Sequence, residues 1–476
     1  MRKISFHFVT TLLVLLSVYT ATMAQSKGFD VSRMNNSVEA CTDFFEYANG
    51  TWLKNTEIPA AYSRWGSFNV LAENNRDILK SVLDESIKVK GAPGSDMQLI
   101  GDYYSSCMDE AGIEKAGITP LEPYFNQIAK IKNVRDLERQ IAMMHNMGIP
   151  VLFGLGGGPD IKNSSMNIAN AGQGGLSLPN REYYLNGDEK SQKTREKFRE
   201  YMINMFKLLG DSEMDAHSNA QTIFQIQTRL AYASKAPVEL RNPDNRYNKI
   251  SFEEAKQITP NFDWDLYMQT RQISPITEIN VGQPDFFKAM NAMLKDISIG
   301  QWKTYLRWML INSAAPILSK KFVDENFNFY SAYLQGTKEQ QPRWKRCVTA
   351  TDGDLGEALG TEYVKKAFTP EAKARMDELI TNLFAAMKER ISGLDWMSGE
   401  TKVQAQKKLS TFKRKIGYPD VLRGYKGLAI SRDSYLENSM TSNQFQVRRN
   451  LEDIGKPVDR TRWGMTPPTV NAYYNG

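Results

Sequence analysis

The chain has 476 residues, of which 41% are hydrophobic and 24% are charged. This composition is typical of globular proteins and excludes a disordered or fibrous chain, and the length favours two lobes or domains over a single core. The formal net charge is +6, but the charges are interspersed, so the chain has no basic stripe of the kind that binds nucleic acid.

The first 24 residues have the pattern of a cleavable signal peptide. Arg2 and Lys3 form a basic start, an apolar run extends from Thr10 to Val18, and small residues precede a cleavage site after Ala24. A membrane anchor is the alternative, but the run is short for a bilayer span of about 20 residues. No cysteine stands at the cleavage site, so a bacterial lipid anchor is not supported. We therefore expect an exported protein, periplasmic or secreted, with no stable membrane span after signal cleavage.

After the signal segment, the chain is loop-rich to about residue 70, with Asn49 and Gly50 as turn formers. Beyond it, apolar residues recur with helical periodicity. Helices are expected at 71–88, 97–108, 134–147, 190–209, 219–233, 301–311, 320–333, 370–391 and 398–412. The helix at 370–391 is the best marked, because Thr369 can cap it and Pro370 suits its first position. Segments 151–158 and 165–168 predict a small β-hairpin.

Two short motifs suggest ligand binding, but both depart from the required patterns. The glycine cluster from Gly154 to Gly158 is followed by Pro159, where the dinucleotide fingerprint needs its third glycine, and no Gly-Lys-Ser/Thr follows. Hairpin glycines are therefore favoured. Asp352-Gly353-Asp354 lacks the later ligands of a calcium loop, so we interpret it as a turn before a helix that begins near Leu355.

Candidate catalytic residues are scarce after the signal segment. Two histidines follow that segment, His145 and His217, and neither is expected to have a His or carboxylate partner at the spacing of a metal site. We expect His145 to be hydrogen-bonded at the edge of the core and His217 to be solvated near a helix start. The sequence has no Gly-x-Ser-x-Gly elbow and no cysteine in the setting of a nucleophile. A serine hydrolase that uses either histidine remains a distant alternative.

The chain has three cysteines, Cys41, Cys107 and Cys347. Export permits disulfides, and an odd number leaves one cysteine without an internal partner. That cysteine is a free thiol, a link to another chain, or one whose partner lies beyond Gly476.

Eight segments, in order along the chain, resemble a known family. They are CTDFFEYANGTW (41–52), SRWGSF (63–68), YSSCM (104–108), GGLSLPNREYY (174–184), RNP with YNK (241–249), WKRCV (344–348), IGYPD (416–420) and VNAYY (470–474). Together they are similar to the neprilysin, endothelin-converting enzyme and oligoendopeptidase O family of zinc metallopeptidases. The resemblance covers essentially the whole chain after the signal segment.

The resemblance implies a mainly α fold. A large helical lobe with a small β-hairpin is expected, together with the beginning of an incomplete, thermolysin-like catalytic lobe. The implied divisions are the signal peptide at 1–24, an N-terminal segment associated with the catalytic lobe at 25–45, the helical lobe at 46–415, and the start of the catalytic lobe at 416–476.

In this family a His-Glu-x-x-His zinc helix follows the Asn-Ala-aromatic-Tyr segment, and the sequence given ends before such a motif. The resemblance therefore implies zinc in the full-length enzyme, none bound by this fragment, and no catalytic or metal-binding residue within these 476 residues. In such an enzyme, zinc polarises the scissile carbonyl and activates water.

The resemblance also implies four substrate-binding residues. Asn471 and Ala472 match the pair that hydrogen-bonds the main chain of the peptide substrate. Arg64 matches an arginine that meets the free carboxylate of short substrates, and Phe68 matches an aromatic residue of the pocket after the scissile bond. Ala72 stands where the family has a second basic residue.

For the cysteines, the resemblance implies a Cys107–Cys347 disulfide. It matches Cys41 to a family cysteine whose partner lies near the C-terminus and is absent from this sequence.

We thus expect the N-terminal part of an exported zinc endopeptidase that cleaves oligopeptides within an enclosed cavity, and that is inactive alone. The alternative is a stand-alone, non-catalytic peptide-binding or partner-binding protein derived from such a peptidase.

Overall fold

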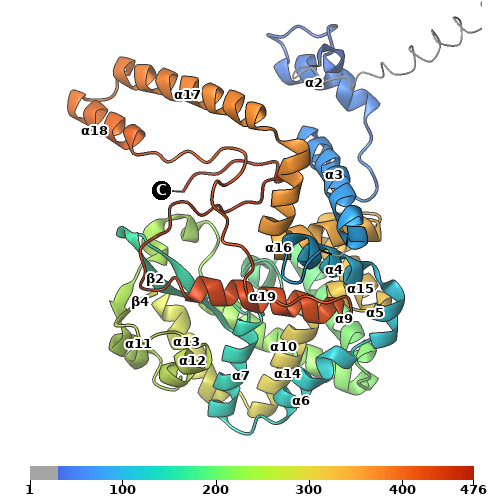
Figure 1. Ribbon diagram of the computed structural model, residues 1–476. Coiled ribbons are helices and arrows are strands. Elements are labelled where there is room, and N and C mark those ends of the chain that lie inside the picture. Colours follow the sequence, from blue (N-terminus) through green and yellow to red (C-terminus); the bar gives the residue numbers. More distant parts are fainter. Residues whose placement is uncertain (1–29, 90, 476) are drawn as a thin grey trace, which may run out of the picture. The chain divides into compact units, whose positions relative to one another are not determined.

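A computed structural model of the chain describes residues 30–89 and 91–475. These residues are mainly helical with one small sheet, which confirms the predicted fold class (Figure 1). The predicted signal peptide, residues 1–24, lies outside the described residues. The chain divides into two compact units, one ending at Trp65 and the other beginning at Gly66.

The described part of the N-terminal unit contains η1 (Val31–Arg33) and α2 (Phe44–Asn55). Asp43 caps α2 by accepting a hydrogen bond from the Glu46 backbone N–H at 2.9 Å. The expectation of loops holds for residues 56–66, which contain no helix or strand, but Asn49 and Gly50 are not turn formers, because both lie inside α2. Gly50 is a packing residue: a Cβ on it would overlap the Glu46 carboxyl group, which accepts a hydrogen bond from Asn35 at 3.0 Å.

The larger unit contains most of the described chain. Its α-helices are α3 (Ser67–Val89), α4 (Asp96–Met108), α5 (Glu110–Ala116), α6 (Glu122–Ala129), α7 (Val134–Asn146), α8 (Glu182–Leu185), α9 (Glu189–Leu208), α10 (Glu213–Ala233), α11 (Phe252–Ile258), α12 (Trp264–Thr270), α13 (Pro284–Asp296), α14 (Ile299–Ala314), α15 (Lys320–Asn326), α16 (Arg343–Ala367), α17 (Pro370–Gly393), α18 (Gly399–Ser410) and α19 (Tyr435–Leu451). Short 3-10 helices are η2 (Thr119–Leu121), η3 (Glu239–Arg241), η4 (Pro243–Arg246) and η5 (Ala315–Ile317), and η6 (Phe327–Tyr333) is a π-helix.

Each segment predicted as helical overlaps a helix of the structure, although segment 320–333 divides into α15 and η6. One of the predictions for this unit was wrong. Asp352-Gly353-Asp354 is not a turn but lies inside α16, which is interrupted only at Leu355, where φ is −127° and ψ is 31°. The low periodicity after residue 416 also concealed α19.

The four strands are β1 (Phe153–Asp160), β2 (Asn163–Gln173), β3 (Lys249–Ser251) and β4 (Glu278–Val281), in the order β1-β2-β4-β3. β1 and β2 form the predicted antiparallel hairpin, while β4 pairs parallel with β2 and antiparallel with β3. A Cβ on Gly156 or Gly157 would press against Asn450 of α19. The glycine cluster therefore serves close packing of a strand against a helix.

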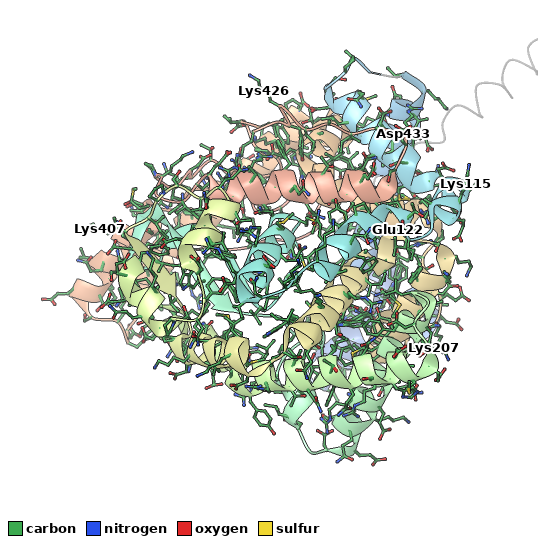
Figure 2. The ribbon with its side chains drawn as sticks, turned by 90° about the horizontal axis from the view of Figure 1, so that it is seen from below. Lys115, Glu122, Lys207, Lys407, Lys426 and Asp433 are labelled. Carbon is green, nitrogen blue, oxygen red and sulfur yellow. A yellow bond between two sulfur atoms is a disulfide. The ribbon has the colours of Figure 1, made fainter. Side chains whose placement is uncertain are left out.

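The apolar interior of the larger unit forms two clusters. The first is rich in aromatic residues and joins the sheet to α7, α9, α10, α12, α13 and α14. The second lies among α3, α4 and α16, with Leu83, Ile100 and Leu359 fully buried. Side chains occupy the space between the helices (Figure 2). Charged side chains such as Lys207 of α9 and Lys407 of α18 are exposed at the surface.

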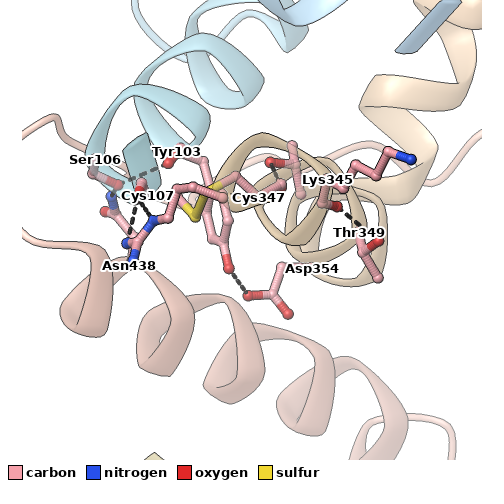
Figure 3. Close-up of a disulfide and its surroundings, with 10 residues drawn as sticks. Tyr103, Ser106, Cys107, Lys345, Cys347, Thr349, Asp354 and Asn438 are labelled. Atoms are coloured by element: carbon pink, nitrogen blue, oxygen red, sulfur yellow. Dashed lines mark hydrogen bonds between the residues drawn. A yellow bond between two sulfur atoms is a disulfide. The ribbon is translucent and has the colours of Figure 1, made fainter. Parts of the chain in front are cut away.

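A disulfide joins Cys107 of α4 to Cys347 of α16, as the resemblance implied (Figure 3). The Arg343 guanidinium donates to the Cys107 carbonyl oxygen, and Tyr103 donates a hydrogen bond to Asp354. Cys41, in the N-terminal unit, is a free and exposed cysteine among the described residues.

Candidate functional site

The candidate site centres on residues 464–475, here called the C-terminal segment. It follows α19 and contains no helix or strand in the described range. Thr466 donates a hydrogen bond from its hydroxyl to Asp352 Oδ2 at 3.0 Å. One and two turns further along α16, Gly356 and Gly360 face Thr466 and Pro467 so closely that a Cβ on either glycine would overlap them. Asp352, Gly356 and Gly360 thus form a narrow seat for the segment.

Helix α3 holds the same segment from a second direction. Asn75 donates from Nδ2 to the Pro468 carbonyl oxygen at 2.8 Å. Its Oδ1 accepts a hydrogen bond from the Tyr363 hydroxyl of α16 at 2.9 Å. Pro468 is buried. The backbone just before Asn471 is therefore fixed by two helices that are packed against each other.

Asp352 is partly buried where the segment meets α16. Burial raises the pKa of its carboxyl group to about 6, and the hydrogen bond from Thr466 opposes that rise. Its Oδ1 has no hydrogen-bond partner among the described residues. The carboxyl group is therefore protonated below about pH 6 and ionised above it.

Asn471 and Ala472 follow directly after the fixed part of the segment, and both are exposed. The Asn471 N–H donates to the Thr469 carbonyl oxygen at 3.1 Å, and its Oδ1 accepts from the Ala472 N–H at 2.8 Å. Among the described residues, the Asn471 Nδ2 and the Ala472 carbonyl oxygen make no hydrogen bond to a neighbour. One donor and one acceptor are therefore directed to solvent.

The two tyrosines after Ala472 make contacts within the segment and with residue Phe412 before α19. The Tyr473 hydroxyl accepts a hydrogen bond from the Gly464 N–H at 3.0 Å. The Tyr474 ring lies 5.5 Å from the Phe412 ring, between centroids. Asn471 and Ala472 are thus bounded by contacts on both sides.

Phe68 lies in the first turn of α3, and 66% of its side chain is exposed. Asn75 follows seven residues later, so the two side chains share one side of α3 about two turns apart. The structure thereby places Phe68 and the anchor of the C-terminal segment on the same helix. Ala72, between them, has no charge. Arg64 is exposed and belongs to the N-terminal unit.

The anchoring residues Asp352, Gly356, Gly360 and Asn75 were not recognised from the sequence. A signal existed, because Asp-x-x-x-Gly-x-x-x-Gly places three small or short side chains on one face of a helix. Because residues 352–354 were interpreted as a turn, Asp352 was not placed on the same helix as Gly356 and Gly360.

The residues present do not fit a zinc centre. The described residues include no cluster of three His, Cys, Asp or Glu side chains. Both ring nitrogens of His145 are engaged, with Nδ1 2.7 Å from the Tyr267 hydroxyl and Nε2 donating to the Val151 carbonyl oxygen at 2.7 Å. His145 is hydrogen-bonded, as predicted, but it is buried in the core rather than at its edge. His217 is exposed near the start of α10, as predicted, but the expectation that it has no carboxylate at ligand spacing was wrong, because Glu213 lies one helical turn before it with Oε1 3.2 Å from Nε2.

Comparison with known proteins agrees with the fold and the sequence motifs. A family model described as peptidase family M13 matches residues 40–419. Human endothelin-converting enzyme 1 is 31% identical over 467 residues, which are 94% of this chain and 60% of that protein. The endothelin-converting enzyme homolog of Locusta migratoria is 30% identical over 475 residues, which are 93% of this chain and 64% of that protein.

A solved structure extends the agreement to three dimensions. The zinc metalloprotease Zmp1 of Mycobacterium tuberculosis, in complex with an inhibitor, has a TM-score of 0.90 and 33% identity, covering 94% of this chain and 68% of that one. The chain belongs to peptidase family M13. It spans 60% to 64% of the length of the curated relatives named above. Within the described residues, no helix combines the length and the apolar character that crossing a bilayer requires.

Proposed function

We propose that this chain is the N-terminal, substrate-positioning part of an exported zinc metalloendopeptidase that hydrolyses oligopeptides within an enclosed cavity. In this proposal, the zinc ligands and the catalytic residues come from sequence outside these 476 residues. The supporting observation is the TM-score of 0.90 to a zinc metalloprotease over 94% of the chain.

In the proposed enzyme, Asn471 and Ala472 bind the main chain of the peptide. The Asn471 amide donates to a peptide carbonyl oxygen, and the Ala472 carbonyl oxygen accepts from a peptide N–H. Main-chain pairing of this kind tolerates many peptide sequences because it does not involve side chains. The seat on α16 and the Asn75 anchor support this role, because they fix the backbone before these two residues and leave their polar groups exposed.

Arg64 and Phe68 supply selectivity in this proposal. Arg64 pairs with the free carboxylate of a short peptide, and the exposed Phe68 ring packs against the side chain after the scissile bond. Because Ala72 has no charge, the carboxylate is held by one arginine rather than two.

Metal analysis and a peptide-cleavage assay on the purified chain test the proposal. We expect no stoichiometric zinc and no chelator-sensitive hydrolysis. One zinc per molecule together with chelator-sensitive cleavage would overturn the assignment of catalysis to sequence outside the chain.

The reading frame downstream of Gly476 provides a second test. An in-frame His-Glu-x-x-His motif supports the proposed enzyme. A stop codon directly after Gly476 favours the stand-alone peptide-binding or partner-binding protein.

Peptide binding tests the role of Asn471 directly. Asn471→Ala is expected to weaken the binding of a fluorescent, non-cleavable peptide about fivefold to tenfold, because one hydrogen bond contributes about 1 kcal/mol. Asn475→Ala removes the same side chain from the same segment and should leave the affinity unchanged. Equal affinities of the Asn471→Ala variant and the wild type would exclude this contact.

A further inference from the structure

A pocket of about 350 Å³ opens in the larger unit, away from the C-terminal segment. It lies between α19, the start of β1 and the chain that follows α7 and α12. Its lining is His145, Gly148, Ile149, Pro150, Phe153, Gly154, Leu155, Arg271, Gln446, Val447 and Asn450. The family resemblance assigned no role to any of these residues.

Arg271 is the charged residue of this pocket, and only 3% of it is exposed. Its Nε donates to Asn146 Oδ1 at 3.2 Å, and its Nη1 donates to the Leu155 carbonyl oxygen at 2.9 Å and to the Tyr267 hydroxyl at 2.8 Å. These acceptors are all neutral. Among the described residues, Arg271 forms no ion pair and its Nη2 donates to no neighbour. The pocket therefore holds a buried positive charge without a counter-charge.

The surroundings of Arg271 do not supply that counter-charge. None of the described Asp or Glu residues lines the pocket. Arg448 of α19 donates to the carbonyl oxygens of Arg271 and Gln272, and its own carboxylate partner is Glu452. His145 is neutral, because burial and the nearby Arg271 charge lower its pKa to about 3. The field inside the pocket is therefore positive.

The remaining walls are mostly apolar. Ile149, Phe153, Leu155 and Val447 provide hydrocarbon surface, and the Gln446 amide adds a polar group at the α19 side. A pocket of this size accommodates a molecule as large as an amino acid or a short peptide end.

The backbone beside the pocket is held in an unusual conformation at two points. Leu152, next to Phe153, has a φ of 59°, and Gln272, next to Arg271, has a φ of 52°. Left-handed backbone is uncommon for residues other than glycine and persists where the surrounding structure enforces it. At Leu152 the Tyr305 hydroxyl accepts the backbone N–H at 2.9 Å. Both walls are therefore fixed in place before a ligand arrives.

We propose that this pocket binds a small carboxylate with an apolar body, such as the C-terminal residue of a short peptide or a free N-acylated apolar amino acid. Arg271 Nη2 pairs with the carboxylate, and the apolar walls cover the side chain. This site goes beyond the proposed peptidase function, because none of its lining residues belongs to the C-terminal segment.

Calorimetric titration of the purified chain with N-acetyl-phenylalanine, and separately with N-acetyl-phenylalaninamide, tests the proposal. The two probes have the same ring, and only the first carries a carboxylate. We expect saturable binding of the acid and at least tenfold weaker binding of the amide. No saturable binding of the acid, or equal binding of both probes, would overturn the proposal.

Variants at position 446 locate the site without disturbing the hydrogen bonds of Arg271. Gln446→Glu places a carboxylate in the pocket, so binding of the acid should fall at least tenfold. In the wild type, Gln446 Nε2 donates a hydrogen bond to the Asp354 carbonyl oxygen at 3.4 Å, and both substitutions remove it. Gln446→Ala removes this bond without adding charge, so this variant should bind the acid within twofold of the wild type. Gln444→Glu adds the same charge to an exposed position of α19 outside the pocket, and should also leave binding unchanged.

Unchanged binding in Gln446→Glu, or an equal loss in Gln444→Glu, would show that the acid binds elsewhere. Asn471→Ala should retain full binding of the acid. A failure of this proposal is thereby separated from a failure of the peptide-binding role of Asn471.

Discussion

Helices α16 and α17 follow one another and have nearly the same length, 25 and 24 residues, but they differ in burial. Nine residues of α16 are buried, whereas Ile391 is the single buried residue of α17. α16 packs in the second apolar cluster and holds both the disulfide and the C-terminal segment. α17 lies beside α18 (Figure 1), with Leu379, Leu383 and Met387 exposed along one face.

The difference separates two reasons for a segment to be helical. α17 begins with strong local signals, because Thr369 accepts a hydrogen bond from the Ala372 N–H at 3.3 Å and Pro370 occupies the first turn. α16 begins after Pro342 without a side-chain cap and contains an interruption at Leu355. Tertiary packing therefore stabilises α16, while α17 depends mainly on its own sequence.

The largest expected effect on stability comes from removing the disulfide that holds α16. Cys347→Ser removes a link between residues 240 positions apart, and should lower the free energy of unfolding by about 5 kcal/mol, since the link restricts a very long loop of the unfolded chain. Urea denaturation measures the change. Cys41→Ser, which removes an exposed free thiol, should have no effect. An unchanged midpoint for Cys347→Ser would show that α16 does not need its covalent link.

Two leucine truncations compare the helices directly. Leu359 of α16 is fully buried, whereas 57% of Leu383 of α17 is exposed. Leu359→Ala should cost about 3 kcal/mol through lost burial and the cavity left behind, and Leu383→Ala should cost less than about 0.5 kcal/mol. Both values follow from urea denaturation. Similar costs would mean that the apolar face of α17 is covered in solution.

Hydrophobic periodicity located α7 because its core positions Leu137 and Ile141 recur at helical spacing. It failed for α19, because several buried residues of that helix are polar. Asn438, for example, is buried, but its Nδ2 donates to Ser106 Oγ at 2.9 Å. Hydrophobic periodicity assigns a polar residue to the solvent side even when the residue is buried and hydrogen-bonded, so the sequence of α19 shows no apolar face.

In the candidate site, too, some residues were selected from the sequence and others were found only in the structure. Resemblance to a family selected Asn471, Ala472, Arg64 and Phe68, and these substrate roles stay predictions. The seat that fixes the C-terminal segment depends on contacts between residues more than 100 positions apart, such as Thr466 with Asp352. The Asp-x-x-x-Gly-x-x-x-Gly pattern marks a helix face with short side chains, but it does not identify the distant segment that packs there, and glycines that permit close approach resemble glycines of turns.

Asp352 makes the stability of α16 depend on pH. Its pKa is raised to about 6 in the folded chain, whereas the unfolded chain ionises from about pH 4. The folded state therefore keeps a proton that the unfolded state has lost, and the free energy of unfolding falls as pH rises from about 4 to about 6. Asp352→Asn keeps an acceptor for Thr466 and should stabilise the chain by about 2 kcal/mol above pH 6, with little change at pH 4.

Urea denaturation at pH 4, 6 and 8 measures this effect. Glu371→Gln is a suitable control in α17: its pKa is lowered by local hydrogen bonds at the exposed helix start, so the variant should not gain stability above pH 6. A pH profile of Asp352→Asn parallel to that of the wild type would show that the carboxyl group is already ionised without cost.

The smallest effect distinguishes two glycines of α16. Gly360→Ala places a Cβ against Pro467 and should release the C-terminal segment at a cost of about 1 kcal/mol. A Cβ on Gly353 has no atom within 4 Å, so Gly353→Ala should stabilise the helix by up to about 1 kcal/mol. Hydrogen exchange of residues 464–475 measures the release directly. Faster exchange in Gly360→Ala alone would show that the seat on α16 fixes the position of Asn471. Equal exchange in both variants would show that Asn75, not the seat, holds the segment.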